Sequence, residues 1–138
     1  MIFLDSWVWL EYLFSGQNAD VAESLIERAN QPAVGGLIAP TVLAEVCYRV
    51  HVVEDEKTAD ESIRAIQAFE YIESVPLIDE IAAYAAKLRV KYYQRGEREI
   101  SSADAIHLAT AIVHNDCTVL YSGDTDFLDI DEIETIVL

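Results

Sequence analysis

The sequence predicts an α/β fold with three layers, in which helices cover both faces of a central, mostly parallel sheet. Short apolar runs, such as residues 1–4 and 36–39, alternate with longer segments whose apolar side chains recur at helical spacing. Strands that alternate with helices pair in parallel, because each helix returns the chain to the starting edge of the sheet. The length of 138 residues suits one domain with its own core. We therefore expect a single domain over residues 1–138.

Two strands and four helices are expected in the first half of the chain. Ser6, directly after Asp5, can cap the first helix, and Pro40 suits the first turn of the third helix. Pro32 marks the end of the second helix, because proline cannot continue the backbone hydrogen bonds. The expected strands are residues 1–4 and 36–39, and the expected helices lie at about 6–14, 21–29, 40–50 and 63–69.

Three strands and two helices are expected in the second half. Gly96 follows the first of these helices and suits its C-terminal end. Ser101 or Ser102 can cap the second helix, ADAIHLATAIVH, and Asp104 then stands where the acid of a capping box would lie. The expected strands are residues 75–78, 118–121 and 135–138, and the expected helices are about 79–94 and 103–114.

The formal net charge of −16 is extreme for this size and opposes attraction of nucleic acid by the overall field of the protein. The acids come with only three lysines, a composition that suits a high-salt cytoplasm, where the Debye length is about 3 Å at 1 M salt. We therefore expect a halophilic source. Five of the nine basic residues lie between positions 87 and 98. That stretch is ordinarily a solvated helix face, and phosphate contact is the alternative.

No apolar run reaches the roughly 18 to 20 residues that span a bilayer. The start MIFLDSWVW also reaches an aspartate too early for a signal peptide. We expect a cytoplasmic protein that makes no membrane contact. Cys47 and Cys117 have apolar neighbours and no metal-binding spacing, so both are predicted to be reduced core residues.

Four motifs occur in order along the chain: LDSW at 4–7, TVLAEV at 41–46, SSADAIHLATA at 101–111 and YSGDTDF at 121–127. Together they resemble the PIN-domain family, especially the VapC-type toxins of toxin–antitoxin pairs, over essentially the whole chain. The resemblance implies a PIN-like fold and a ribonuclease that depends on Mg²⁺ or Mn²⁺. The metal-binding and catalytic acids that it implies are Asp5, Glu45, Asp104 and Asp124, with Asp126, Ser6 and Ser122 as supporting residues.

Two features depart from the usual family pattern. Trp7 and Trp9 are bulkier than is common after the first acid, and Gly123 stands where a polar residue is frequent. Neither removes an expected ligand. We expect the departures to affect the choice of substrate more than activity.

The chemistry of the acids points the same way. Asp5 and Asp124 come just after two of the expected strands, and ligands of open α/β sheets bind beyond the carboxyl ends of the strands. Converging carboxylates repel one another unless a cation joins them, and their hard oxygen atoms suit Mg²⁺ or Mn²⁺. Such an ion can activate water and neutralise charge on a phosphodiester. The sequence therefore predicts metal-assisted hydrolysis.

Each candidate also has a simpler interpretation. Asp5 could be only a helix cap, and Asp104 is favoured in a first turn by the helix dipole alone. Glu45 could be a surface acid paired with Arg49 four residues later, or Arg49 could steady a metal-binding Glu45. His107 could face the site from one turn after Asp104, but a histidine on an apolar helix is more often a packed structural residue. Asp126 is either a supporting acid or part of a solvated turn.

Other families whose strands end in acids fit less well. A receiver domain needs a lysine after its last strand, and none follows Lys91. A phosphatase of the haloacid-dehalogenase type needs the pattern DxDxT, where this chain has Asp5-Ser6-Trp7. The alternatives within the PIN family are an RNA-processing nuclease without an antitoxin and a catalytically weak binding module.

The expected protein partners follow from the first helix and from the resemblance. Its aromatic and apolar side chains exceed what so short a helix can bury, so some are expected to form an interface. These residues are Trp7, Trp9, Tyr12, Leu13 and Phe14. The VapC resemblance implies a homodimer and an antitoxin, whose basic segment the net charge of −16 would attract.

Overall fold

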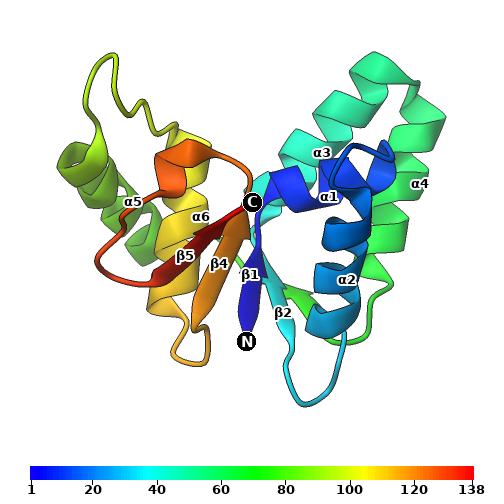
Figure 1. Ribbon diagram of the computed structural model, residues 1–138, viewed down its shortest axis with the longest axis horizontal. Coiled ribbons are helices and arrows are strands. Elements are labelled where there is room, and N and C mark those ends of the chain that lie inside the picture. The colour runs from blue at the N-terminus through cyan, green and yellow to red at the C-terminus, as the bar shows by residue number, and fades with distance from the viewer.

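The computed structural model describes all residues 1–138 and is built around a sheet of five parallel strands (Figure 1). The strands are ordered β3-β2-β1-β4-β5 across the sheet, and every neighbouring pair is parallel. Their bounds are β1 Ile2–Leu4, β2 Gly36–Ile38, β3 Ile72–Ser74, β4 Val119–Ser122 and β5 Glu134–Val137. The predicted parallel sheet is confirmed.

Six α-helices and one short 3₁₀ turn connect the strands. Their bounds are α1 Ser6–Leu13, α2 Ala19–Ala29, α3 Pro40–Val53, α4 Glu56–Gln67, α5 Asp79–Tyr92 and α6 Ser102–Val113, with the turn η1 at Thr125–Phe127. In Figure 1, α5 and α6 lie on one side of the sheet and α1 to α4 lie on the other. The predicted three-layer α/β arrangement is therefore confirmed.

The three inner strands are mostly apolar in sequence, which suits their burial on both faces of the sheet. Every residue of β1, β2 and β4 is buried, as expected for parallel strands that helices cover on both sides. The edge strand β5 is only half-buried, and in β3 only Ile72 is buried. The strands β1 and β4, which lie side by side inside the sheet, are therefore part of the buried core.

The strand expected at residues 75–78 is wrong, because β3 ends at Ser74. The last bond of this edge runs from the Val75 amide to the Ile38 carbonyl at 2.9 Å, and Pro76 has no N–H with which to continue. Glu73 and Ser74 are exposed within the strand. The sequence pattern typical of a buried strand therefore lies at residues 75–78, which follow β3 in the chain.

The first helix ends at Leu13, within the predicted bounds, but its N-cap differs from the prediction. Asp5, rather than Ser6, occupies the N-cap position, and its side chain makes no capping bond. Trp9 is completely buried and not free for an interface, whereas Trp7 is half-buried. Tyr12 alone of the five apolar residues counted there is exposed.

The remaining expectations on burial are met only in part. Cys47 and Cys117 are free and lie half-buried against the core rather than inside it.

None of the helices combines the length and the apolar character that a membrane span would require.

Candidate metal centre

The register between β1 and β4 brings Asp5 next to Ser122. Leu4 is paired with Tyr121, and the Asp5 amide donates to the Tyr121 carbonyl at 3.1 Å. The next side chains along both strands meet at the carboxyl edge of the sheet, where Ser122 Oγ donates to Asp5 Oδ2 at 2.7 Å. The same hydroxyl accepts a bond from the Asp124 amide at 3.0 Å. Ser122 therefore links the segments that carry the first and last expected acids.

Helix α6 contributes two further side chains from one face. Ser101 caps the helix by accepting a bond from the Asp104 amide at 3.0 Å, which fixes Asp104 in the first turn and His107 one turn later. His107 is completely buried, and its Nδ1 lies 2.8 Å from Asp5 Oδ1. Because an ionised carboxylate only accepts, Nδ1 donates this bond.

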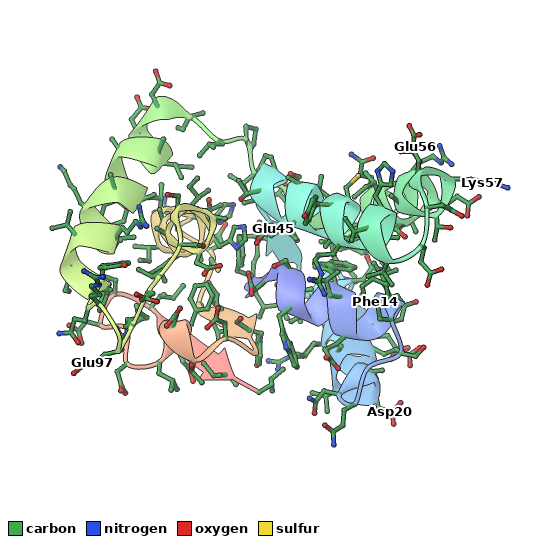
Figure 2. All side chains as sticks on the ribbon, turned by 90° about the horizontal axis from the view of Figure 1, so that it is seen from above. Phe14, Asp20, Glu45, Glu56, Lys57 and Glu97 are labelled. Carbon is green, nitrogen blue, oxygen red and sulfur yellow. The ribbon has the colours of Figure 1, made fainter.

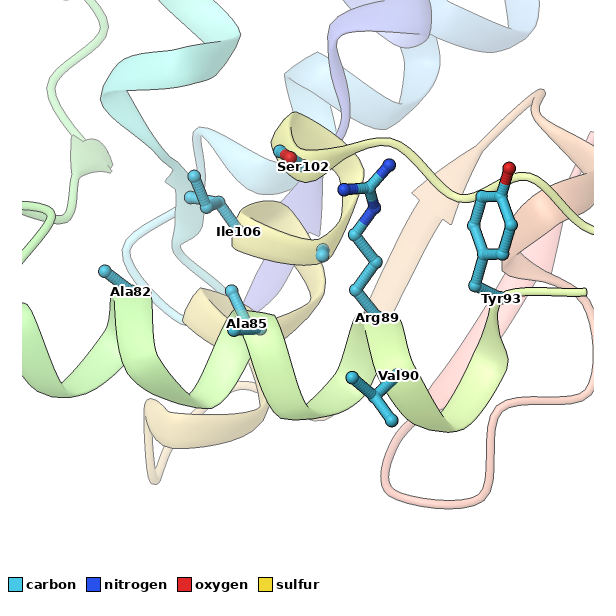
Figure 3. A pocket seen from close by; sticks show the side chains of 9 residues that line it. Ala82, Ala85, Arg89, Val90, Tyr93, Ser102 and Ile106 are labelled. Atoms are coloured by element: carbon cyan, nitrogen blue, oxygen red, sulfur yellow. The ribbon is translucent and has the colours of Figure 1, made fainter.

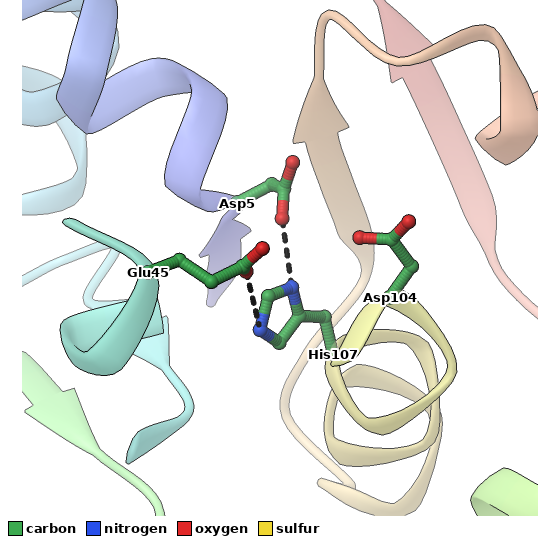
Figure 4. A group of neighbouring side chains, drawn as sticks. All are labelled: Asp5, Glu45, Asp104 and His107. Atoms are coloured by element: carbon green, nitrogen blue, oxygen red, sulfur yellow. Dashed lines mark hydrogen bonds and ion pairs between the residues drawn. The ribbon is translucent and has the colours of Figure 1, made fainter. Parts of the chain in front are cut away.

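Helix α3 adds Glu45 from the opposite side of the histidine ring (Figure 4). Its Oε1 lies 3.5 Å from His107 Nε2, and both of these buried atoms lack a hydrogen-bond partner. Its side chain is 37 % exposed, and Figure 2 shows Glu45 near the centre of this end of the molecule. The anticipated ion pair with Arg49 is absent, since Arg49 is exposed and forms no salt bridge. Arg49 is therefore not part of this geometry.

The expected acids form one continuous cluster in which Asp104 belongs to two groups. In each group the candidate ligand atoms lie within 4.8 Å of one another. The first group is Asp5, Glu45, Asp104 and His107, and the second is Asp104, Asp124 and Asp126. The Asp126 amide also donates to Asp124 Oδ1 at 2.9 Å. Asp126 is thus part of the cluster and not in a separate solvated turn.

Burial and mutual repulsion raise the pKa of most of these acids. Burial, reinforced by the charge of Asp5, raises the pKa of Asp104 to about 6. Burial also raises the pKa of Glu45, while His107 and the Ser6 hydroxyl oppose the rise. The pKa of Asp126 is raised by burial and then by Asp124. The protein alone therefore leaves part of this negative charge uncompensated.

Asp5 differs from these three acids, because two donors stabilise its charged form. Burial alone would raise its pKa, but the hydrogen bond and charge of His107 and the bond from Ser122 hold it below the ordinary value. Asp5 is therefore an ionised carboxylate enclosed by protein. Ser6 adds a smaller stabilising effect through its backbone.

Lysine and arginine do not neutralise the cluster. The salt bridges of the protein include none between a lysine or arginine and Asp5, Glu45, Asp104, Asp124 or Asp126. The basic stretch acts elsewhere: Lys91 pairs with Glu132 at 2.6 Å, and Arg98 donates to the Leu128 carbonyl at 2.6 Å. Uncompensated carboxylates with hard oxygen atoms fit a divalent cation such as Mg²⁺ or Mn²⁺.

His107 is the site residue that the sequence did not identify. Its spacing from Asp104 allowed it to face the site, but its apolar neighbours favoured a packing role. The structure shows both properties together: the ring packs 5.8 Å from the Phe3 ring and also bonds to Asp5. Helical spacing alone could not show which nitrogen meets an acid.

An apolar groove lies apart from the acids, between α5 and α6 (Figure 3). Its volume is about 640 Å³, and most of its lining is apolar. The lining includes Ala82, Arg89, Val90, Tyr93 and Ile106, and it includes no acid. This groove therefore does not have the chemistry of a metal centre.

A family model described as "PIN domain" matches residues 2–133. The chain belongs to the PIN-domain family. The family resemblance is thereby confirmed, and the acidic cluster lies in a fold whose members are generally nucleases. A search of curated proteins gave no match.

Solved structures with the same fold include several toxin–antitoxin proteins. VapBC2 from Rickettsia felis, bound to a DNA fragment of its promoter, superposes with a TM-score of 0.77 at 19 % identity, covering 99 % of this chain and 98 % of that one. VapC20 from Mycobacterium tuberculosis, a toxin that cleaves the sarcin–ricin loop, gives 0.74 at 21 % identity, covering 97 % and 99 %. A toxin–antitoxin complex from Klebsiella pneumoniae gives 0.68 at 23 % identity, covering 96 % and 95 %. These likenesses show a common fold.

Proposed function

We propose that this PIN-domain protein is a divalent-metal-dependent endoribonuclease that hydrolyses phosphodiester bonds in RNA. The observation that carries the proposal is the convergence of four acids from separate segments, without a lysine or arginine partner. A bound Mg²⁺ or Mn²⁺ lowers the pKa of a water molecule and neutralises charge that develops on the phosphate. The chain contributes the cradle of oxygen atoms that selects such an ion.

Each acid has a distinct part in the proposed reaction. Asp5, Asp104 and Asp124 hold the ion, and Ser122 and Asp126 orient Asp5 and Asp124 through the hydrogen bonds described above. Glu45 joins them from α3 and is the most suited to accept a proton, because its pKa is raised and its side chain is partly exposed. A carboxylate with a pKa closer to neutrality transfers protons more efficiently than an ordinary one.

A nuclease assay with matched variants tests the assignment. D5N, D104N, D124N and E45Q are each expected to lose most cleavage of a long RNA in the presence of Mg²⁺ or Mn²⁺, whereas wild type cleaves it. D20N provides the control, because Asp20 is an exposed acid on α2, far from Glu45 in Figure 2. Cleavage at the wild-type rate by all four site variants contradicts the proposal.

Metal linkage provides a second test that does not depend on the choice of RNA. Mg²⁺ or Mn²⁺ should raise the melting temperature by binding the native state, and the rise should grow with ion concentration. Excess EDTA should abolish cleavage. Full activity in excess chelator is the result that rejects the metal requirement.

We propose further that the nuclease is the toxin of a VapBC-type pair, acting on cellular RNA in the cytoplasm. Its fold is shared with toxins of such pairs, and its unpaired acids can receive a basic segment of an antitoxin. Expression should arrest growth, and co-expression of a small neighbouring gene with a basic C-terminal segment should relieve the arrest. Harmless expression and no such gene would favour an RNA-processing nuclease. Absence of cleavage with metal present would favour a binding module.

We also propose that the protein forms a homodimer. Large apolar side chains are exposed on two of its helices: Val90 at 84 % on α5, and Tyr48 at 68 % and Val52 at 66 % on α3. Val90 borders the apolar groove between α5 and α6. Light scattering at high salt should give twice the chain mass, and V90E should shift the equilibrium to monomer. A wild-type monomer at high concentration contradicts the proposal.

A further inference from the structure

His107 is an ionisable side chain that the fold encloses completely. Burying a polar ring costs free energy unless its nitrogen atoms find partners, and only Nδ1 has one, the carboxylate of Asp5 at 2.8 Å. An apolar residue would fill this part of α6 at lower cost, since Phe3 and Leu108 are also completely buried here. The buried position of the ring is therefore best explained by its hydrogen bond to Asp5.

The two oxygen atoms of Asp5 are each held by a different element. His107 on α6 bonds to Oδ1, and Ser122 at the end of β4 bonds to Oδ2 at 2.7 Å. With both oxygen atoms held, the carboxylate cannot rotate freely about its bond to Cβ. Their second lone pairs remain able to meet an ion. Asp5 is thus pre-oriented before any cation arrives.

We propose that His107 is a positioning residue of the metal centre, whose Nδ1–H fixes the orientation in which Asp5 meets the cation. The inference rests on the proposed metal-dependent function. The ring does not bind the cation itself: Nδ1 is engaged by Asp5, and Nε2 is buried and faces Glu45 Oε1 at 3.5 Å (Figure 4). Hydrogen-bonding partners of metal ligands contribute about 10- to 100-fold to metal affinity or activity.

A Mn²⁺ titration of wild type, three His107 variants and one control variant tests this role. Free Mn²⁺, measured by its electron paramagnetic resonance signal, gives the affinity of wild type and of H107N, H107Q and H107L. H107L should bind Mn²⁺ about 10- to 100-fold more weakly. H107N should retain most of the affinity, because its amide N–H lies near the position of Nδ1. H107Q should not, because its amide reaches toward the position of Nε2.

The comparison of Asn with Gln separates positioning from packing. Both are polar amides, so a role in packing alone would not favour the smaller one. H114N is the control, because His114 follows the far end of α6 and pairs with Glu73 at 3.5 Å. It should bind Mn²⁺ as wild type does. Melting curves in chelator establish that each variant is folded, and if H107L is not, the Asn and Gln variants decide.

Each remaining outcome contradicts a specific statement. Wild-type affinity in H107L, or equal affinity in H107N and H107Q, overturns the positioning role while leaving the metal-dependent function intact. A nitrogen coupling from imidazole in the electron spin echo spectrum of Mn²⁺-loaded wild type also overturns it, because the ring would then be a ligand. Failure of wild type to bind Mn²⁺ overturns both the proposed function and the role of His107.

Discussion

The indole ring of Trp7 fills the space that a side chain on Gly123 would occupy. A Cβ atom at position 123 would overlap the six- and five-membered rings of Trp7. Gly123 lies between Ser122 and Asp124, and Trp7 comes two residues after Asp5. The two departures from the family pattern are therefore one feature, in which a large residue on α1 requires the smallest residue on the neighbouring loop.

G123A should lower the free energy of unfolding by about 1–3 kcal/mol, the usual cost of overpacking. In a W7A background the same substitution should cost close to nothing, since the overlapping ring is gone. Urea denaturation of the four proteins in this double-mutant cycle measures the coupling. Equal costs of G123A in both backgrounds would show that the two residues do not compete for space.

Asp5 and Asp104 should respond in opposite ways to loss of charge without metal. The raised pKa of Asp104, about 6, means that the native state favours its protonated form, so at pH 7 its charge destabilises the fold. D104N should therefore raise the melting temperature in chelator at pH 7 by a few degrees. The lowered pKa of Asp5 means that its charge stabilises the fold at this pH, and D5N should lower the melting temperature. A stabilised D5N protein is the contrary result.

The sequence was sufficient to predict that these acids lie together, but not the electrostatic environment of each. Asp5, Asp104 and Asp124 were visible because they directly follow strands or begin a helix, and parallel pairing brings such positions to one edge. The difference between Asp5 and Asp104 depends on which donors reach each carboxylate. That depends on strand register and on the rotation of α6, which local spacing does not specify.

The fold, like the site, was predicted from the sequence only in part. Strong apolar runs predicted β1, β2 and β4, whereas β3 was misplaced because its exposed Glu73 and Ser74 resemble loop residues. The first-helix interface was predicted from hydrophobicity alone. The structure removes one of the side chains on which that prediction depended. Trp9 packs into the core, where its ring centre lies 5.7 Å from that of Phe69. A contact between residues so distant in sequence leaves no local pattern.

The overall charge should make stability depend on salt. With 25 acidic and 9 basic residues, the folded surface carries repulsion that screening relieves. The melting temperature should rise as the KCl concentration increases from 0.1 to 2 M. The rise should be about as large with NaCl, since screening does not distinguish the two salts. Thermal melts in chelator keep specific metal binding out of the comparison. A melting temperature that falls or stays constant over this range would contradict adaptation to high salt.

Cation affinity should fall as the pH drops through about 6. Asp104 has a pKa of about 6 in the metal-free protein, so well above that value the ion meets a charged carboxylate and releases no proton from it. Below that value each bound ion must displace a proton, and affinity should decrease by up to about tenfold per pH unit. Isothermal titration of Mn²⁺ between pH 5 and 8 measures the profile. D104N should bind weakly at every pH and lose this inflection, whereas D20N should keep it. An affinity that is constant between pH 5 and 7 in the wild-type protein would show that Asp104 does not hold the ion.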